Sequence, residues 1–591
     1  MMLDAITFYN QQLKQHKLAS IRLHKQLKVL SVLRLFVFLI AAFLSYVFFP
    51  NGTLMTATIA VAGVLFLFLV TLYTNRKHQY KLEKRLIQIN EEELKIASGD
   101  YLHRPDGMVY QKAQHNYSLD IDLFGKGSFF QVLNRTGLKA GTAQLSQLVL
   151  SNDTNDIKLK QEAVQELSQK PQWRQRYLAL AQGIHTEHSA NAIKHWLLSY
   201  TPSLNRLTYK FSIGFSIASM LVIALTIFQF IPINYAVFWL LIGLGITGYF
   251  VKRVNALAQH TSLAKDTIKQ YALLLKQIEQ ETFKAQLLRR QQDNITSAKL
   301  KASEIFTKFS KNLDALDNRN NLISAVFGNG FFLWDIRQSY KIEQWILAYN
   351  ETVEEWFGVV TFFDAYNSLG NYAFNHSSFV YPAITDGASV IEAQQLGHPL
   401  INSEKRVSSD VTLLKSQFFI VTGANMAGKS TFLRTVALHI VMANVGLPVC
   451  AAASTYKPIK LITSMRTSDS LTDDSSYFFS ELKRLKHIVE ALDKDNDTFV
   501  ILDEILKGTN STDKAIGSRK FVEKLVGQKA TGIIATHDLS LTAIEKDLSA
   551  VNNYFFDAQI VKGQLEFNYK LQPGICQNMN ASFLLKKMNI V

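Results

Sequence analysis

The sequence predicts a mixed α plus α/β protein with two apolar helical hairpins, a helical middle and a carboxy-terminal α/β domain. Its 591 residues are too many for a single hydrophobic core, so several domains are expected. Two stretches, 35–75 and 211–251, each run for 41 residues without a charge. From about residue 400, short β-branched runs alternate with helical ones, which is typical of an α/β domain.

The two uncharged stretches predict transmembrane hairpins over 31–74 and 211–251. A membrane-spanning helix needs about 20 apolar residues, so each stretch holds two spans and a turn. Pro50-Asn51-Gly52 breaks the first stretch and Ile231-Pro232-Ile233-Asn234 breaks the second. A buried hairpin of a soluble protein is the alternative, but such a hairpin carries charges on its outer face and these stretches have none.

Basic residues predict how the hairpins are oriented. Lysine and arginine flank the inner ends of both stretches and are missing from both turns. The positive-inside rule then places both termini and every large segment in the cytoplasm, with four spans in the cell (inner) membrane and lipid as a partner. Part of the net charge of +15 is explained in this way, which weakens that charge as evidence for nucleic acid.

The remaining segments divide the chain further. We expect a cytoplasmic segment at 1–30, a helical linker and the first part of a helical core at 75–205, and lever helices with the second part of that core at 252–395. The α/β domain follows at 396–591. Between Lys252 and Lys311 there are 12 basic and 5 acidic residues, which fits either a solvated helix face or a surface that faces DNA. The two cysteines are far apart in sequence and predict neither a disulfide framework nor a zinc site.

Residues 418–431, FFIVTGANMAGKST, form a P-loop between an expected strand and an expected helix. Gly423 and Gly428 allow backbone N–H groups to approach phosphates, and the helix amino terminus adds a favourable dipole. Lys429 is expected to reach the β- and γ-phosphates, and the Ser430 hydroxyl to bind Mg²⁺. The residues predicted to bind ATP are Gly423, Ala424, Asn425, Met426, Ala427, Gly428, Lys429, Ser430 and Thr431. The motif predicts an enzyme that hydrolyses ATP.

Two further strands are expected to complete the site. Thr498 to Glu504 is an apolar run that ends in two carboxylates. Asp503 suits the metal side, and Glu504 suits the base that orients the attacking water. The strand that begins at Thr531 leads to His537, which we expect to contact the γ-phosphate because the carboxyl ends of parallel strands meet at one edge. We therefore assign Glu504, His537 and Lys429 as catalytic.

These motifs, in this order, resemble the MutS family of DNA mismatch-repair ATPases. The resemblance is carried by TGANMAGKST, TSMRTSDSLTDDSSYFFSEL at 463–482, VILDEILKGTNSTD at 500–513, ATHDL at 535–539 and the His398-Pro399 pair. LDIDLFGKGSFFQVLNRT at 119–136 and NLISAVFGNGFFLWDIR at 321–337 are similar to the two ends of the helical core in shorter MutS-like proteins. The resemblance covers roughly residues 115–591.

The resemblance implies a head-to-tail homodimer with composite ATP sites. A signature loop, Gly508, Thr509, Asn510 and Ser511, would close over the ATP of the partner. Transporter-type ABC ATPases place their signature before the Asp-Glu strand, whereas this loop follows it. The adenine contacts implied are Arg406, near the position of a stacking aromatic, and Phe555.

The sequence also departs from the repair proteins. We find no counterpart of the mismatch-reading domain, and the Phe521-Val522-Glu523 triplet is a chance match to its wedge. The second apolar hairpin interrupts the helical core where lever helices of the family carry the DNA clamp.

Three functions follow from these features. The first is a membrane-anchored MutS-like ATPase that binds DNA in an ATP-dependent way, by phosphate contacts that do not depend on sequence. The second is a membrane ATPase whose dimer closure acts on the membrane helices or on a protein partner, without DNA. The third, half of an ABC transporter, is disfavoured by the order of the motifs and by the small number of spans.

Overall fold

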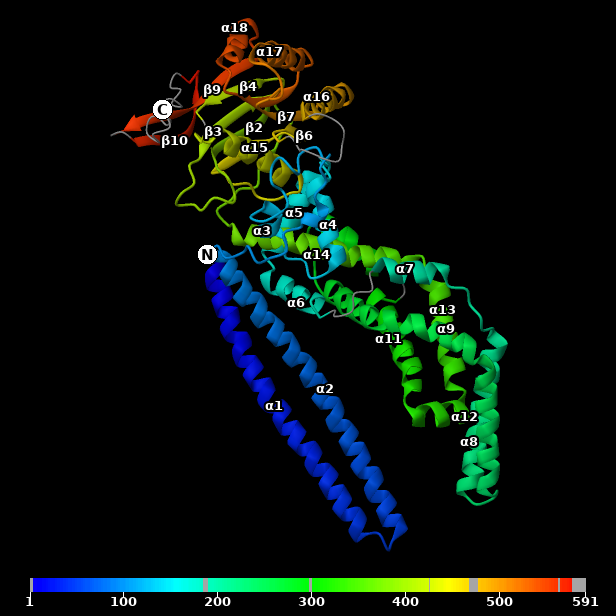
Figure 1. The fold of residues 1–591 in the computed structure, drawn as a ribbon. Coiled ribbons are helices and arrows are strands. Elements are labelled where there is room, and N and C mark those ends of the chain that lie inside the picture. Colours follow the sequence, from blue (N-terminus) through cyan, green and yellow to red (C-terminus); the bar gives the residue numbers. More distant parts are fainter. Residues whose placement is uncertain are drawn as a thin grey trace.

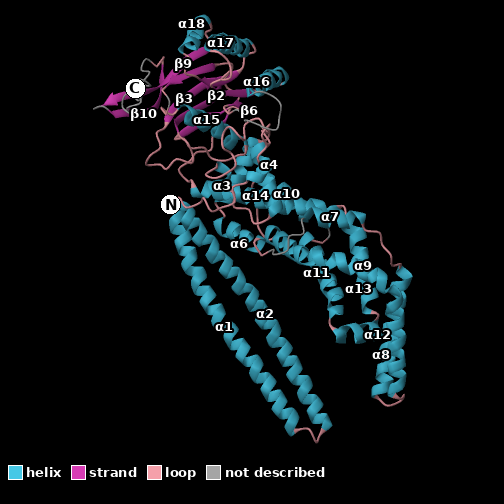
Figure 2. Ribbon diagram, in the orientation of Figure 1, coloured by secondary structure: helices cyan, strands magenta, loops and turns pink. Residues whose placement is uncertain are grey.

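A computed structural model describes residues 4–183, 190–296, 300–424, 426–466, 477–561 and 564–576. An α/β domain lies at one end of the molecule, a helical core lies beside it, and two helical hairpins extend away from it (Figure 1). All described strands gather in the α/β domain, and the other regular elements of the described chain are helices joined by loops (Figure 2).

The first hairpin consists of α1 (Ala5–Val47) and α2 (Gly52–Ala97). Its turn lies at residues 48–51, where the Asn51 side chain accepts a hydrogen bond from the N–H of Leu54 and caps α2. Both helices contain windows long and apolar enough to cross a membrane, and few residues of these windows are buried in the protein. The same helices continue past the apolar windows into the charged flanks.

The second hairpin consists of α8 (Arg206–Ile227) and α9 (Ile233–Glu279). Asn205 caps α8 by accepting a hydrogen bond from the N–H of Thr208. The apolar part of α9 continues without a break into its polar part, so a single helix joins the hairpin to the core. The four predicted apolar helices are confirmed as helices of sufficient length and hydropathy, and their crossing of a membrane stays a prediction.

A helical core joins the hairpins to the α/β domain. Its long central helix, α14 (Thr352–Asn375), is buried along most of its length. The other helices of this region are η1 (Met108–Tyr110), α3 (Phe129–Leu133), α4 (Lys139–Leu150), α5 (Ile157–Ser168), α6 (Pro171–Ala181), α7 (Ala190–Ser199), α10 (Gln286–Thr296) and α11 (Ala302–Asp317). At the start of α4, the carboxylate of Asp364 accepts hydrogen bonds from the N–H groups of Gly137 and Leu138, 2.9–3.1 Å away.

The segment 321–337 connects α11 to α13 and follows η2 (Asn318–Asn320). It forms η3 (Ser324–Gly328), α12 (Asn329–Phe332) and the start of α13 (Trp334–Tyr349). Leu333 and Ile336 form a separate apolar cluster with Phe215 of α8. The segment therefore packs against the second hairpin through contacts between its apolar side chains and those of α8 and α9.

The carboxy-terminal domain is built on a six-stranded sheet in the order β10-β9-β4-β8-β7-β6. Its strands are β4 (Phe418–Gly423), β6 (Lys460–Ser464), β7 (Thr498–Asp503), β8 (Thr531–Ala535), β9 (Val551–Val561) and β10 (Gln564–Pro573). All neighbouring pairs are parallel except β9 and β10. The helices of the domain are α15 (Lys429–Asn444), α16 (Tyr477–Lys494), α17 (Ser511–Gly527), η4 (Leu539–Ala543) and α18 (Ile544–Asp547).

A second, four-stranded sheet has the order β1-β5-β2-β3. It contains β1 (Ala383–Ile384), β2 (Ser389–Leu396), β3 (Ser409–Leu414) and β5 (Ala453–Tyr456). The strands thus begin ahead of the expected domain start at 396. The sequence does not signal β2 clearly, because its burial does not alternate and a left-handed residue, Gln395, interrupts its register with β3.

Candidate functional site

The parallel strands β4, β8 and β7 lie side by side and end at the same edge of the sheet. In register, Val421 of β4 pairs with Ala535 of β8, and Ala535 pairs with Asp503 of β7. The residues that follow each strand therefore converge, as the sequence predicts for the P-loop, the two carboxylates and His537.

The P-loop connects β4 to α15 through backbone conformations that favour glycine. Gly423 has φ 147° and Gly428 has φ 108°, and a Cβ atom on Gly423 would lie 2.7 Å from the carbonyl oxygen of Phe556. The ammonium of Lys429 donates hydrogen bonds to the carbonyls of Gly423 at 2.9 Å and Ala424 at 3.1 Å. Asn425 lies outside the described residues.

Ser430 and Asp503 supply two oxygen atoms at the start of α15. The Ser430 hydroxyl donates to Oδ2 of Asp503 over 2.8 Å. Burial raises the pKa of Asp503 from its ordinary value, against the opposing effect of this hydrogen bond. A hydroxyl and a carboxylate are ligands that Mg²⁺ prefers, and Mg²⁺ takes its other ligands from phosphate and water. Among the described residues, no group of three or more His, Cys, Asp or Glu side chains could hold a metal ion.

Glu504 and His537 lie within hydrogen-bonding distance of each other beside the P-loop lysine. Nε2 of His537 lies 2.9 Å from Oε1 of Glu504 and 3.1 Å from Nζ of Lys429. The hydrogen bond from His537 lowers the pKa of Glu504 to about 2, so the carboxylate is ionised at neutral pH. Burial lowers the pKa of Lys429.

A single ring nitrogen of His537 faces both neighbours. When Nε2 carries a proton it donates to Glu504, and when it does not it accepts from Lys429. The tautomer of His537 therefore determines whether Nε2 is hydrogen-bonded to Glu504 or to Lys429. Glu504 itself has a left-handed backbone, with φ 51°, and its N–H donates to the carbonyl of Ala535.

A cavity of about 580 Å³ opens at this edge of the sheet. Its phosphate end is lined by Ala424, Met426, Gly428, Lys429, Ser430, Thr431, Asp503, Glu504 and His537. The cavity is also lined by Leu396, Gly397, His398, Ile401, Lys405, Val407, Phe556 and Tyr569. Burial lowers the pKa of His398 to about 4, so its ring is neutral at the pH of the cell.

The expected adenine contacts, Arg406 and Phe555, are not among the residues that line this cavity. The guanidinium of Arg406 lies over the ring of Phe379, 5.8 Å from its centroid. Side chains alternate along a strand, so Phe556 rather than Phe555 faces the P-loop, where it packs on Phe432. Val407 and Tyr569 line the cavity, and the adenine contacts of Arg406 and Phe555 stay a prediction.

The expected signature loop lies between β7 and α17. Asn510 caps α17, and its side chain accepts a hydrogen bond from the N–H of Asp513 over 2.8 Å. Gly508 packs against Phe478, where a Cβ atom would approach to 2.9 Å. Gly508, Thr509, Asn510 and Ser511 do not line the cavity of their own chain.

Two sets of residues escaped the sequence analysis. Glu481 of α16 accepts the N–H groups of Leu506 at 2.5 Å and Lys507 at 3.1 Å, and so positions the turn after Glu504. Asp120 of the core accepts hydrogen bonds from the Thr463 hydroxyl and from the N–H groups of Met465 and Arg466, all within 3.1 Å. Both carboxylates lie within motifs that resemble the MutS family, but only the fold shows which groups donate hydrogen bonds to them.

The P-loop helix is also linked to the core. Asp122 pairs with Arg466 at 2.6 Å and with Arg434 of α15 at 3.2 Å. Arg434 lies on the helix that begins with Lys429 and Ser430. Arg434 therefore connects α15 to the segment around residue 120, where it also donates a hydrogen bond to the carbonyl of Asp120.

This sheet, the P-loop and the carboxylate strand define a P-loop nucleotide-binding domain. Residues 419–586 match the family model of MutS domain V. The chain is 33% identical over 216 residues to the human MutS protein homolog 4, covering 34% of this chain and 22% of that protein. It is 34% identical over 216 residues to the DNA mismatch repair protein MutS of Fusobacterium nucleatum, covering 33% of this chain and 24% of that one. A further relative, the DNA mismatch repair protein MutS of Methanosarcina barkeri, is 30% identical over 243 residues, or 40% of this chain and 27% of its own length.

The carboxy-terminal part of this chain is therefore similar to domain V of the MutS family, the ATPase domain of that family. Use of ATP with Mg²⁺ is a trait of this family. The chain spans only about a quarter of the length of these relatives.

Proposed function

We propose that this chain is a membrane-anchored MutS-type ATPase that hydrolyses ATP in a composite site of a homodimer. The observation that carries the proposal is the convergence of Lys429, the Ser430–Asp503 pair and the Glu504–His537 pair at one edge of the sheet. These groups match, one for one, the needs of phosphoryl transfer: a cation for the phosphates, oxygen ligands for a metal, and a base for water.

Each residue has a separate task in this proposal. The P-loop backbone and Lys429 bind the phosphates, and Ser430 and Asp503 would hold Mg²⁺. Bound Mg²⁺ would neutralise charge on the β- and γ-phosphate oxygens. Glu504, ionised because His537 lowers its pKa to about 2, accepts a hydrogen bond from the attacking water and orients it. His537 holds Glu504 until its ring turns toward the γ-phosphate.

The dimer supplies the remaining part of the site. Residues 508–511 are displayed at the amino terminus of α17 and lie outside the cavity of their own chain. A helix amino terminus favours an anion, so this loop is suited to the γ-phosphate of a partner. The site of one chain is then complete only when the partner closes over it.

Membrane anchoring is supported by the four apolar helices. Their apolar windows have mean hydropathy of 1.5 to 2.4, and 6–22% of their residues are buried in the protein, so most residues of each window are left accessible by the chain itself. Both hairpins would place the ATPase domain in the cytoplasm, because their inner flanks carry the basic residues.

DNA is the first candidate for what the ATPase acts on. Two of the relatives bear the name DNA mismatch repair protein, and the lever region of this chain is basic. Some of that charge is neutralised within the chain, since Lys265 pairs with Asp314 and Asp317 at 2.8 and 2.9 Å. Binding to DNA would rest on the remaining cations and would depend strongly on salt.

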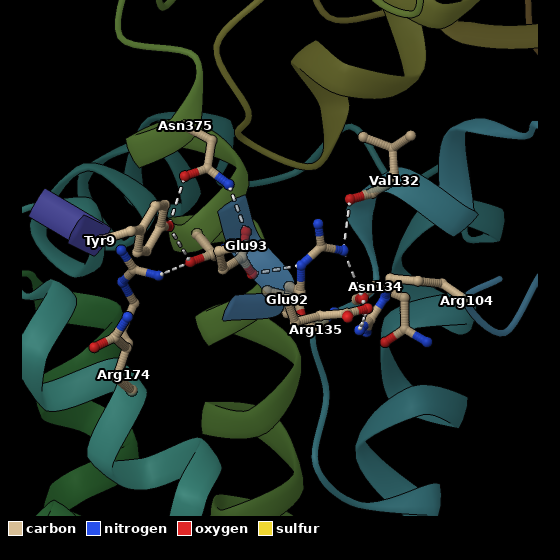
Figure 3. A network of polar contacts seen from close by, with 12 residues as sticks. Tyr9, Glu92, Glu93, Arg104, Val132, Asn134, Arg135, Arg174 and Asn375 are labelled. Atoms are coloured by element: carbon tan, nitrogen blue, oxygen red, sulfur yellow. Dashed lines mark hydrogen bonds and ion pairs between the residues drawn. The ribbon is translucent and has the colours of Figure 1, made fainter. Parts of the chain in front are cut away.

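The membrane helices are the second candidate, and a buried network favours them. Glu93 at the end of α2 pairs with Arg135 of the core at 2.6 Å and accepts hydrogen bonds from Asn371 and Asn375 of α14 (Figure 3). Tyr9 of α1 donates to Asn375 at 2.7 Å, and burial raises its pKa so that the phenol keeps its proton. The first hairpin is thus fixed to the end of α14, the helix that leads into the strands of the ATPase domain.

Binding assays on the purified full-length chain discriminate the two candidates. We would measure gel shifts with homoduplex, mismatched and branched DNA at two salt concentrations, with and without ATP. Retardation that weakens with salt and depends on ATP supports the DNA-binding function. No retardation at low salt, with ATPase activity intact, would eliminate DNA and leave the membrane helices or a protein as the target.

A further inference from the structure

An uncharged segment between α11 and α13 is not accounted for by the ATPase or by the hairpins. No residue from 320 to 334 carries a charge. The segment is too short for a span, and it forms η3 and α12, joined to α13 at Leu333. Its apolar side chains Leu322, Ile323 and Phe327 are 78%, 69% and 53% exposed. Such a cluster on a soluble surface would mark an interaction site.

The contacts of this segment place it at the depth of the bilayer. Gly330 meets Gly243 of α9 backbone to backbone, so that a methyl group added to Gly243 would collide with the carbonyl of Gly330. Gly243 precedes Lys252 by nine residues, about 14 Å along a helix. Since the hydrocarbon layer is about 30 Å thick, that contact lies near its middle if α9 crosses the membrane. Figure 1 shows α12 beside the α8–α9 hairpin.

A second contact gives a similar depth on α8. The hydroxyl of Ser216 lies 3.1 Å from the carbonyl oxygen of Phe332, and Leu333 packs against Phe215. Ser216 follows Lys210 by six residues, about 9 Å along the helix. Both helices of this hairpin thus place residues 330–333 inside the apolar layer if the hairpin crosses the membrane.

The backbone of the segment suits an environment without water. The helical path breaks at Leu333, which has φ 47°. At this break Asn329 accepts a hydrogen bond from the N–H of Asp335 at 2.9 Å. The Ser216 hydroxyl shares its proton between the carbonyl of Phe332 at 3.1 Å and that of Ser212 in its own helix at 2.8 Å. Within a bilayer, irregular backbone is tolerated only when protein groups satisfy it in this way.

The charges on either side of the segment also suit this environment. Arg319 and Asp335, the first charged residues before and after it, form an ion pair with an N–O distance of 3.4 Å. Pairing removes two isolated charges from the entrance to the apolar layer. The side-chain oxygen of Asn321 accepts a hydrogen bond from the N–H of Ile323 in the same turn.

We propose that residues 320–334 form a re-entrant turn that is immersed in the membrane beside α8 and α9, with Leu322, Ile323 and Phe327 in contact with lipid acyl chains. This inference rests on the proposed membrane crossing of the second hairpin. It adds a fifth membrane-embedded element, which belongs to the core rather than to a hairpin. Because α11 and α13 lead directly into the core, the turn ties the position of the core to the bilayer.

Depth-dependent quenching tests the proposal on the full-length chain in phosphatidylcholine and phosphatidylglycerol vesicles. A cysteine replaces Phe327 and carries an environment-sensitive fluorophore, and the vesicles contain nitroxide at carbon 12 of the acyl chain or on the headgroup. Cys450 and Cys576 are buried, so the unsubstituted chain provides the labelling blank. Leu322→Cys repeats the measurement at a second exposed position of the turn.

Two leucines of α9 provide matched references with similar exposure. Leu241 lies two residues from Gly243, and Leu273 lies in the polar part of the helix. We expect blue-shifted emission and strong quenching by the acyl-chain nitroxide for the Phe327→Cys and Leu241→Cys probes, and neither effect for Leu273→Cys. ATPase activity of each labelled variant confirms that the chain is folded.

The other outcomes separate the two proposals. Quenching at Leu241 without quenching at Phe327 would overturn the re-entrant turn and keep the membrane crossing. A blue shift at Phe327 without quenching by either nitroxide would show that protein, such as a second copy of the chain, covers the turn, and would also overturn the inference. Absence of quenching at Leu241 would refute the membrane crossing itself and the inference with it.

Discussion

Nε2 of His537 lies 2.9 Å from Oε1 of Glu504, although the two residues follow different strands of the sheet. The pair exists because β7 and β8 are parallel neighbours that end at one edge. It keeps Glu504 ionised and, through the same nitrogen, brings it close to Lys429. The properties of this pair lead to the first prediction.

Replacing Glu504 with glutamine should lower the turnover of ATP by about 10²- to 10⁴-fold, the usual contribution of a positioned base. ATP binding should persist, because the P-loop and Lys429 are unchanged, and the chain should accumulate as an ATP-bound dimer. Turnover, ATP affinity and molar mass by light scattering with ATP measure these effects. Glu523→Gln, on the exposed side of α17, is the control. Undiminished turnover in the Glu504 variant would refute its role as base.

Replacing Lys429 with alanine should abolish measurable ATP binding. The ammonium is the cation of the phosphate end, and loss of one partner from such a charge pair costs about 2–5 kcal/mol, or roughly 30-fold and more in affinity. Equilibrium binding of a fluorescent ATP analogue measures it. Lys415→Ala removes a lysine just before the same strand, where it pairs with Asp497, and should bind ATP normally. Equal affinities for the two variants would contradict the assignment.

Mixing two inactive chains tests whether the site is shared. Ser511→Tyr should block the signature loop, and Lys429→Ala should disable the P-loop, so neither homodimer hydrolyses ATP. A random mixture forms heterodimers in half of its dimers, each with one intact site of two, and should recover about a quarter of the normal activity. Steady-state ATPase of equal mixtures measures this recovery. If Ser511→Tyr alone is fully active, the loop has no role in the partner's site.

The buried carboxyl of Asp364 makes the stability of the core depend on pH. Burial raises its pKa to about 7, well above the ordinary value, so the folded chain binds a proton that the unfolded chain releases. The stability from this group is present below about pH 4 and is lost as the pH rises through 7. Asp364→Asn removes this dependence, so its apparent melting temperature relative to the unsubstituted chain should rise by a few degrees between pH 5 and pH 8.

Thermal unfolding in detergent at both pH values measures this shift. Asp314→Asn changes a more exposed aspartate that is paired with Lys265 and should show no such trend. A constant difference between the Asp364 variant and the unsubstituted chain across this range would show that the carboxyl does not titrate there.

The features that could be predicted from the sequence are those that depend on residues adjacent in the chain. The P-loop, the Asp503-Glu504 pair and the four apolar helices each depend on a local pattern with one physical meaning. The edge where β4, β7 and β8 end also follows, because parallel strands align their carboxyl ends. The fold therefore brings together the residues that were expected at the phosphate end.

The features that sequence missed depend on orientation. Arg406 and Val407 are neighbours, yet one lies on Phe379 and the other lines the cavity, and no residue pattern decides between them. Phe555 and Phe556 differ in the same way, since a shift of one position along a strand reverses the face. The turn at 320–334 reads as part of a helical core until its contacts with Gly243 and Ser216 are known.

The continuity of α9 has a consequence for the environment of the enzyme. A helix of 47 residues is about 70 Å long and runs without a break, so a tilt of its apolar end would be carried toward the end that packs in the core. Spans tilt when the hydrocarbon layer is thinner than their apolar length. The thickness of the surrounding bilayer would then affect the position of the ATPase domain relative to the membrane. Short-chain and long-chain lipids would favour different positions of this domain.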